Sequence, residues 1–260
     1  MKINVVKVEG TKNHFLIIKE NLKNKDLKRI FKKSMSITNY TRIDGFLVLS
    51  PSKKADFKMD YYNNDGSWET MCANGARCAA IYMYEQRLVN KKKMKIETGD
   101  GQHDAEILTQ NLVRISMNTP KYKSRCIKIS DIEGYHIDSG AAHFVVNYGG
   151  ISTTKVKKIG RLIRNDKIFK PRGINVNFYE VLNNQSIKVK TYEKGIEDMV
   201  HSCGTGSLAC VYHLSKTKQI VSPTTILVKG GKLEANFSKN WKKVTLSGPA
   251  KIEEKHQIEI

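Results

Sequence analysis

The chain has 260 residues, of which 40% are apolar, and it carries a formal net charge of +20. This length allows one large domain or two of ordinary size, and the apolar content excludes a disordered chain. No apolar run is long enough to span a membrane and the N-terminal residues lack a signal-peptide core, so we expect a cytoplasmic protein that does not bind membranes. The five cysteines lack CxxC spacing, which favours reduced thiols over a disulfide framework or a metal site.

The excess of positive charge has two interpretations. One is attraction to nucleic acid. However, the lysines are scattered along the chain in pairs and triplets such as 91–93, and no pattern of a known nucleic-acid-binding module accompanies them. We therefore favour a lysine-rich surface, and a basic nucleic-acid-binding protein remains the alternative of another class.

The first half of the chain is predicted to be mainly β-structure, from its alternating apolar residues and β-branched content. One amphipathic helix is expected at 26–35, because Leu27, Ile30, Phe31 and Met35 fall on one face. Strands are expected at 3–8, 14–18, 46–49, 57–62, 94–97, 104–108 and 113–117.

The second half repeats this order of elements. Its amphipathic helix is expected at 153–164, with Val156, Ile159, Leu162 and Ile163 on one face. Strands are expected at 135–137, 144–147, 173–181, 187–192, 225–228, 232–236 and 243–246.

Each half also contains a cysteine just before a glycine-bearing turn and an apolar helix. Cys72 precedes a helix predicted at 76–87, and Cys203, 131 residues later, precedes one predicted at 208–214. A thiol at a helix N-terminus faces unpaired backbone N–H groups and the positive end of the helix dipole, and both favour the thiolate. Free cysteines are more often buried packing residues, but the repetition at half the chain length favours a duplicated unit with one reactive thiol per copy.

The helices after the two cysteines are apolar nearly all round, so each must be buried, most simply by a sheet wrapped around it. This predicts a mixed α/β fold of two similar domains. The domain boundary is expected at 118–121, where a proline and polar residues interrupt the strand pattern, giving domains 1–119 and 120–249. The two cysteine turns are expected to meet across a cleft between the halves.

Two thiols suit the inversion of a carbon stereocentre, because one can remove a proton while the other returns one on the opposite face. The developing charge of an amino-acid substrate would need stabilisation. The first-turn amides at Ala73, Asn74, Gly204 and Thr205 are suited to hold its α-carboxylate. No hydrolase triad, phosphate-binding loop or dinucleotide-binding fingerprint is visible.

The chain resembles the diaminopimelate epimerase family over most of its length. The motifs that carry the resemblance stand in the family's order: Gly10-x-x-Asn13-x-Phe15, Asn63-x-Asp65-Gly66-Ser67, Cys72-x-Asn74-Gly75-x-Arg77-Cys78, Gly140-x-x-His143, Gly173-x-Asn175-Val176-x-Phe178 and Cys203-Gly204-Thr205-Gly206. The resemblance implies an amino-acid epimerase that uses no cofactor and no metal, and forms homodimers. It also implies that the last strand, within 250–260, completes the first domain.

The resemblance further implies a role for each matching residue. Cys72 and Cys203 would be the acid–base pair, tuned by His143 and by Glu193. Arg77 is suited equally to bracing a carboxylate within the protein and to binding substrate. The residues expected to bind the substrate are Asn13, Asn63, Ala73, Asn74, Asn175, Glu193, Lys194, Gly204 and Thr205.

Two departures from the family pattern affect the far end of the substrate. Ala141 and Ala142 stand where the family has Asn-Pro, and Lys194 stands where it has arginine, which unlike lysine grips a carboxylate with two parallel hydrogen bonds. The leading prediction is conversion of LL-diaminopimelate to meso-diaminopimelate, a step toward lysine and peptidoglycan precursors. A racemase of another amino acid, such as histidine or lysine, is the alternative on the same fold.

Overall fold

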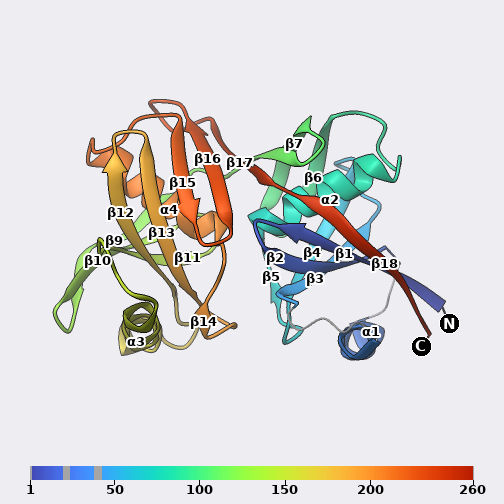
Figure 1. Ribbon diagram of the computed structural model, residues 1–260, viewed down its shortest axis with the longest axis horizontal. Helices are drawn as coiled ribbons and strands as arrows, with labels where there is room; N and C mark the ends of the chain where they lie inside the picture. Colours follow the sequence, from blue (N-terminus) through green and yellow to red (C-terminus); the bar gives the residue numbers. More distant parts are fainter. Residues whose placement is uncertain (1, 20–23, 38–42, 260) are drawn as a thin grey trace. The chain divides into compact units, whose positions relative to one another are not determined.

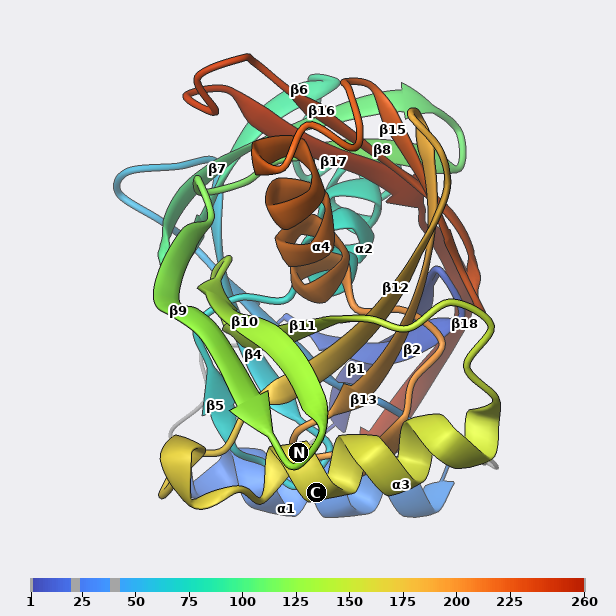
Figure 2. The same cartoon turned by 90° about the vertical axis from the view of Figure 1, so that its left-hand side faces the viewer.

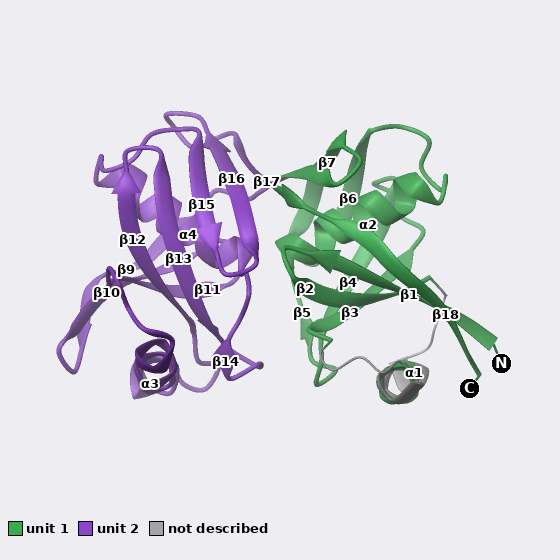
Figure 3. Ribbon diagram, in the orientation of Figure 1, with its two compact units in different colours: residues 1–115, 248–260 green, residues 116–247 purple. Residues whose placement is uncertain are grey.

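The computed structural model describes residues 2–19, 24–37 and 43–259. The chain divides into two compact units (Figure 3): unit 1 comprises Met1–Ile115 and Gly248–Ile260, and unit 2 comprises Ser116–Ser247. The two units repeat one order of strands and helices, which confirms the predicted α/β class with two similar domains.

The strands of unit 1 form a mixed sheet, with both parallel and antiparallel pairs. Strands β1 and β2 form a hairpin, β18 pairs antiparallel with the other edge of β1, and β2 runs parallel to β3. Strand β4 is antiparallel to β3 and parallel to β6, and β6, β7 and β8 continue as an antiparallel meander. The elements are β1 (Lys2–Gly10), β2 (Asn13–Ile18), α1 (Asn24–Ile37), β3 (Gly45–Ser50), β4 (Phe57–Asn63), β5 (Trp68–Glu69), α2 (Ala73–Glu85), β6 (Lys93–Thr98), β7 (Gly101–Thr109), β8 (Leu112–Ser116) and β18 (Lys251–Glu259).

Unit 2 has the same pairing scheme. Strand β10 lies between β9 and β11, β11 runs parallel to β12, and β13 is antiparallel to β12 and parallel to β15. Strands β15, β16 and β17 close the unit as a meander. The elements are β9 (Lys121–Ile129), β10 (Ile132–Asp138), β11 (Ala142–Asn147), α3 (Thr153–Arg164), the 3-10 turn η1 (Lys167–Phe169), β12 (Asn175–Asn183), β13 (Ser186–Glu193), β14 (Asp198–Met199), α4 (Gly204–Lys216), β15 (Thr224–Val228), β16 (Gly231–Phe237) and β17 (Val244–Pro249).

A central helix fills each unit, as the apolar pattern predicts. Helix α2 packs on strands β1 to β4, β6, β7 and β18, and α4 packs on β11 to β13 and β16 (Figures 1 and 2). Every residue is buried from Ala73 to Met83 in α2 and from Gly204 to Val211 in α4. The helix ends therefore present their first-turn groups within the sheet that surrounds them.

The outer helices are amphipathic, as predicted. Helix α3 has the predicted bounds and buries Val156 and Ile163 in the core of unit 2, with Ile159 packed against them. Leu162, which was predicted on the same face, is 46% exposed. In α1, Leu27, Ile30 and Phe31 are buried, whereas the side chain of Met35 lies outside the described part of the chain.

Several predicted bounds were wrong. The central helices begin at Ala73 and Gly204 rather than 76 and 208, because each cysteine is itself the cap residue. The strand predicted at 173–181 runs from Asn175 to Asn183. Strands β5, β9 and β14 were not predicted: β5 and β14 have two residues each, and β9 is mostly exposed and lacks an alternating pattern.

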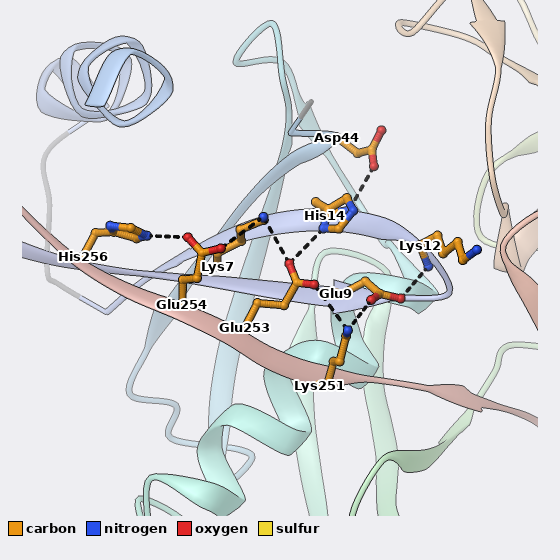
Figure 4. Close-up of polar contacts among 9 residues, drawn as sticks. All are labelled: Lys7, Glu9, Lys12, His14, Asp44, Lys251, Glu253, Glu254 and His256. Atoms are coloured by element: carbon orange, nitrogen blue, oxygen red, sulfur yellow. Dashed lines mark hydrogen bonds and ion pairs between the residues drawn. The ribbon is translucent and has the colours of Figure 1, made fainter. Parts of the chain in front are cut away.

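A network of ion pairs attaches the last strand, β18, to the first hairpin (Figure 4). Glu253 contacts Lys7 at 3.3 Å, His14 at 3.1 Å and Lys251 at 3.4 Å, and Lys251 also contacts Glu9 at 2.9 Å. Partial burial opposes ionisation of Glu253, but the surrounding positive groups outweigh it and hold the pKa of Glu253 below its ordinary value. The network thus favours the charged carboxylate in the folded state.

This lowered pKa predicts acid sensitivity. Glu253 contributes stability at pH values above its ordinary pKa, and the contribution is lost as the pH falls through the lowered pKa of the folded state. We expect Glu253→Gln to lower the urea midpoint near neutral pH and to match the unsubstituted chain in strong acid. The exposed Glu259→Gln is the control. A constant difference between the Glu253→Gln variant and the unsubstituted chain at all pH values would contradict the prediction.

Candidate active site

The two cysteines predicted to be catalytic cap the two central helices in the same way. Cys72 has φ −134° and ψ 107°, and its Sγ accepts from the Gly75 amide at 3.3 Å. Cys203 has φ −129° and ψ 108°, and its Sγ accepts from the Gly206 amide at 3.4 Å. Each sulfur therefore receives a first-turn N–H at the positive end of a 13-residue helix, an environment that favours thiolate over thiol.

The other three cysteines differ from this pair. Cys78 and Cys210 are fully buried inside α2 and α4, and burial raises the pKa of both thiols far above the ordinary value. Cys126 is exposed on β9. Only the two cap thiols combine partial exposure with a helix N-terminus.

In unit 1, Arg77 organises the residues that follow Cys72. Its side chain is fully buried, and its Nη2 donates to Thr11 Oγ1 at 2.8 Å and to Asn74 Oδ1 at 2.7 Å. The amide of Asn74 in turn donates to Asn13 Oδ1 at 3.3 Å. Burial lowers the pKa of Arg77 to about 10, against the opposing effect of the Cys78 and Cys72 sulfurs, so the guanidinium stays charged at neutral pH.

This arrangement shows that Arg77 braces other groups of the protein, but not the carboxylate that was predicted. The guanidinium is inaccessible to solvent, and its Nη atoms donate to an amide, a hydroxyl and a backbone carbonyl rather than to a carboxylate. Arg77 therefore orients Asn74, and through it Asn13, two of the residues predicted to bind substrate. Thr11 reaches the guanidinium from a tight two-residue loop in which Thr11 and Lys12 both have positive φ, at 54° and 58°.

We expect Arg77→Met to destabilise the fold by about 2 kcal/mol, because it removes the Nη2 donor from two buried oxygen atoms while relieving the desolvation of a buried charge. Urea unfolding measures the change. Arg29→Met, at an exposed position on α1, is the matched control and should change stability by less than about 0.5 kcal/mol. Equal stabilities for the two variants would show that the hydrogen bonds of Arg77 do not support the fold.

Asn63, at the end of β4, lies in a different setting from Asn13 and Asn74. Its Oδ1 accepts from the Tyr61 hydroxyl at 2.9 Å, and its Nδ2 donates to Ser67 Oγ at 3.0 Å. Asp65 accepts from the backbone N–H of Ser67 within the same turn. The structure therefore shows Asn63 holding the turn that leads from β4 to β5.

In unit 2, two of the predicted site residues, His143 and Thr205, meet beside Cys203 at the start of α4. His143 on β11 is fully buried and contacts Thr205 Oγ1 through Nε2 at 2.9 Å, and the Thr205 hydroxyl lies 3.6 Å from Cys203 Sγ. On the other side of the ring, Asn177 Nδ2 lies 3.0 Å from His143 Nδ1. Sequence reasoning missed Asn177, although an amide flanked by Val176 and Phe178 in a buried strand was an available signal.

A second group of predicted residues meets at the start of β12. Asn175 donates through Nδ2 to the carbonyl of Ala142 at 3.2 Å and accepts at Oδ1 from the backbone N–H of Lys194 at 2.9 Å. Glu193 and Lys194 are half-buried at the end of β13. Asn175 thus fixes both backbone segments in which this chain departs from the family pattern.

The described residues contain no group of three or more His, Cys, Asp or Glu side chains placed to hold a metal ion. Within the same part of the chain, no helix is both long and apolar enough to cross a membrane.

Solved structures with this fold include racemases and epimerases. A probable proline racemase from Agrobacterium radiobacter K84 superposes with a TM-score of 0.78 at 16% identity, covering 99% of this chain and 93% of that one. A PhzF-family phenazine biosynthesis protein from Bacillus anthracis gives a TM-score of 0.77 at 12% identity, with full coverage of both chains. These likenesses define the fold class, a duplicated α/β fold.

The sequence defines the family. The family model for diaminopimelate epimerase matches residues 5–123 and 135–253. The diaminopimelate epimerase of Aquifex aeolicus is 32% identical over 93% of this chain and 92% of its own length, and that of Archaeoglobus fulgidus is 31% identical over 92% and 91%. The chain belongs to the diaminopimelate epimerase family and is an isomerase, which confirms the resemblance read from its motifs.

Proposed function

We propose that this isomerase inverts the α-carbon of an amino acid by passing protons through Cys72 and Cys203, and that its substrate pair is LL- and meso-diaminopimelate. The observation that carries the proposal is the duplicated thiol cap, with matching dihedral angles and matching Sγ···H–N contacts in the two units. The relatives named diaminopimelate epimerase support the substrate.

The chemistry follows from the properties of a thiol at a helix N-terminus. The α-proton of an amino acid is weakly acidic, so a base must act while donors stabilise the negative charge that develops. One cap cysteine as thiolate would remove the proton, and the other as thiol would deliver one to the opposite face of the carbon. The proposal requires both sulfurs to reach the same carbon.

The first-turn amides supply the stabilisation in this proposal. Four N–H groups at the start of an α-helix lack partners within the helix. The backbone of Ala73 and Asn74 in α2, and of Gly204 and Thr205 in α4, would bind the α-carboxylate and spread the charge of the carbanion over hydrogen-bond donors.

The other residues predicted to bind substrate would contact the remaining charged groups of diaminopimelate. Asn13 and Asn63 from unit 1 and Asn175 and Glu193 from unit 2 would bind the amino-acid heads. Lys194 would pair with the distal carboxylate as a point charge, where the family has arginine. On this substrate the enzyme would serve lysine and peptidoglycan-precursor synthesis. Location in the cytoplasm, a homodimeric state and the absence of a cofactor remain predictions.

Exchange of the α-proton in D2O tests the proposal. The enzyme is incubated under reducing conditions with LL- and meso-diaminopimelate, histidine and lysine, and the α-proton signals are followed by NMR. We expect exchange and interconversion of the two diaminopimelate isomers alone, with a Cys126→Ser variant as active control. Exchange confined to a monocarboxylic amino acid would show that this amino acid, and not diaminopimelate, is the substrate. Absence of exchange with all of the amino acids tested would overturn the proposed function. Family membership does not favour the alternative of nucleic-acid binding.

A further inference from the structure

A chain of four hydrogen-bond contacts leads from the sheet of unit 2 to the sulfur of Cys203. The Thr191 hydroxyl donates to Asn177 Oδ1 at 2.9 Å, and these two residues are direct cross-strand partners on β13 and β12. Asn177 Nδ2 lies 3.0 Å from His143 Nδ1, and His143 Nε2 lies 2.9 Å from Thr205 Oγ1. The Thr205 hydroxyl is 3.6 Å from Cys203 Sγ.

The chemistry of each group gives these contacts a direction. An amide nitrogen can only donate, so His143 Nδ1 must accept from Asn177. A neutral imidazole that accepts at Nδ1 carries its proton on Nε2, and so donates to Thr205 Oγ1. The single hydroxyl proton of Thr205 is then available to donate to Cys203 Sγ. With that donation, every donor in the series points toward the sulfur.

The orientation of the Asn177 amide has a second support. A Cβ on Gly206 would lie 2.0 Å from Asn177 Oδ1, so a Gly206 hydrogen points at that atom. An oxygen atom can accept a Cα–H contact of this kind. An amide NH2 group in the same place would bring its own hydrogens against the Gly206 hydrogen, and the two would repel each other. The carbonyl end of Asn177 therefore belongs beside Gly206 and Thr191, which leaves the NH2 end for His143.

His143 stays neutral in this setting. It is fully buried, and burial lowers the pKa of His143 to about 3, together with repulsion by His136, when that ring is protonated, and by Lys194. The ring therefore has one proton across the working pH range. It serves as a fixed donor and does not carry protons to or from the substrate.

We infer that Asn177 and Thr191 are positioning residues that hold His143 as an Nε2–H donor, and that this relay directs the Thr205 hydroxyl proton onto Cys203 Sγ. A hydrogen bond to the charged form of a group favours that form, so the relay stabilises the Cys203 thiolate beside the N–H of Gly206. The inference rests on the proposed function, in which Cys203 is one of the two proton carriers.

Unit 1 uses a different arrangement at the matching place. Asn74 there holds the helix position of Thr205, and it accepts from the buried Arg77. The relay is thus a feature of Cys203, and Cys72 in the same molecule provides an internal reference.

The tautomer of His143 is the direct test and needs no substrate. The full chain is labelled with 15N-histidine, the signals of His143 are assigned by comparison with His143→Gln, and two-bond 1H–15N spectra show which ring nitrogen carries the proton. We expect a proton on Nε2, a bare Nδ1, and no titration between about pH 5 and pH 8. A proton on Nδ1, or titration of His143 within that range, would overturn the relay.

The reactivity of Cys203 tests what the relay does. Alkylation by iodoacetamide is followed as a function of pH by peptide mass spectrometry, with Cys72 quantified in the same digest. For Thr205→Val we expect the midpoint for Cys203 to rise by about one pH unit and that for Cys72 to stay in place. Thr205→Ser retains the hydroxyl and should restore the profile.

The remote member of the relay gives an independent check. Thr191→Val removes the hydroxyl that orients Asn177, so we expect a mixture of His143 tautomers and a smaller upward shift for Cys203, and Thr191→Ser should restore both. An unchanged Cys203 profile in Thr205→Val would overturn the inference even if epimerisation is observed. Failure of α-proton exchange with every amino acid would remove the proposed function while leaving the tautomer and alkylation results as they are.

Discussion

Cys72→Ala and Cys203→Ala should each lower the rate of epimerisation by about 10³-fold or more, because inversion by this mechanism needs one proton carrier on each face of the carbon. The contribution of a positioned acid or base is typically about 10²–10⁴-fold. Measurement of the approach to equilibrium from each stereoisomer gives the rates.

The exchange of solvent deuterium separates the two thiols. A variant that keeps one thiol can still remove the proton on that side, so each single variant should exchange the α-proton of one stereoisomer much faster than that of the other. The two variants should show opposite preferences. The same preference in both would contradict a division of the two faces between Cys72 and Cys203.

Loss of folding must be distinguished from loss of chemistry. Each cysteine caps a helix through its Sγ, and removal of a cap side chain costs about 1 kcal/mol. Serine is itself a good cap, so Cys72→Ser and Cys203→Ser should keep the fold and still lose the reaction, since a hydroxyl ionises far less readily than a thiol. Cys126→Ser should keep full activity.

The two thiol caps of the candidate site could be predicted from sequence because one short motif carries their geometry. At Cys72 and at Cys203 a cysteine, a glycine and an apolar helix follow one another directly, and both cysteines stand at a helix start. The catalytic role of the two thiols stays a prediction. The bounds of the helices were wrong at their starts because serine, threonine, aspartate and asparagine are the usual caps, and a thiol in that role has no distinct sequence signal.

Contacts that depend on strand register could not be predicted. Asn177 meets Thr191 because β12 and β13 pair in one register, and Asn177 meets His143 because β11 lies on its other side. Neither neighbour is close in sequence. The role of Asn63 in its own turn was missed for a related reason. The motif shows that an asparagine is present, but not that its amide bonds to Tyr61 and Ser67.

The two glycines that donate to the sulfurs should respond very differently to alanine. A Cβ at Gly206 would lie 2.0 Å from Asn177 Oδ1 and 3.1 Å from His143 Nδ1, and both of these side chains are fully buried and hydrogen-bonded. A Cβ at Gly75 would meet Leu47 Cδ2 at 2.7 Å, the far end of a flexible side chain. The first clash must displace the relay, whereas the second requires a small shift of one methyl group.

We therefore expect Gly206→Ala to destabilise the protein by about 3 kcal/mol, through overpacking and through strained hydrogen bonds among buried groups. Gly75→Ala should cost less than about 1 kcal/mol, because the gain in helix propensity offsets part of the strain at Leu47. Urea unfolding measures both, and Cys203 alkylation should change only in the first variant. A loss below about 1 kcal/mol for Gly206→Ala as well would mean that Asn177 and His143 can move aside freely, and a relay made of freely moving groups could not direct a proton at Cys203.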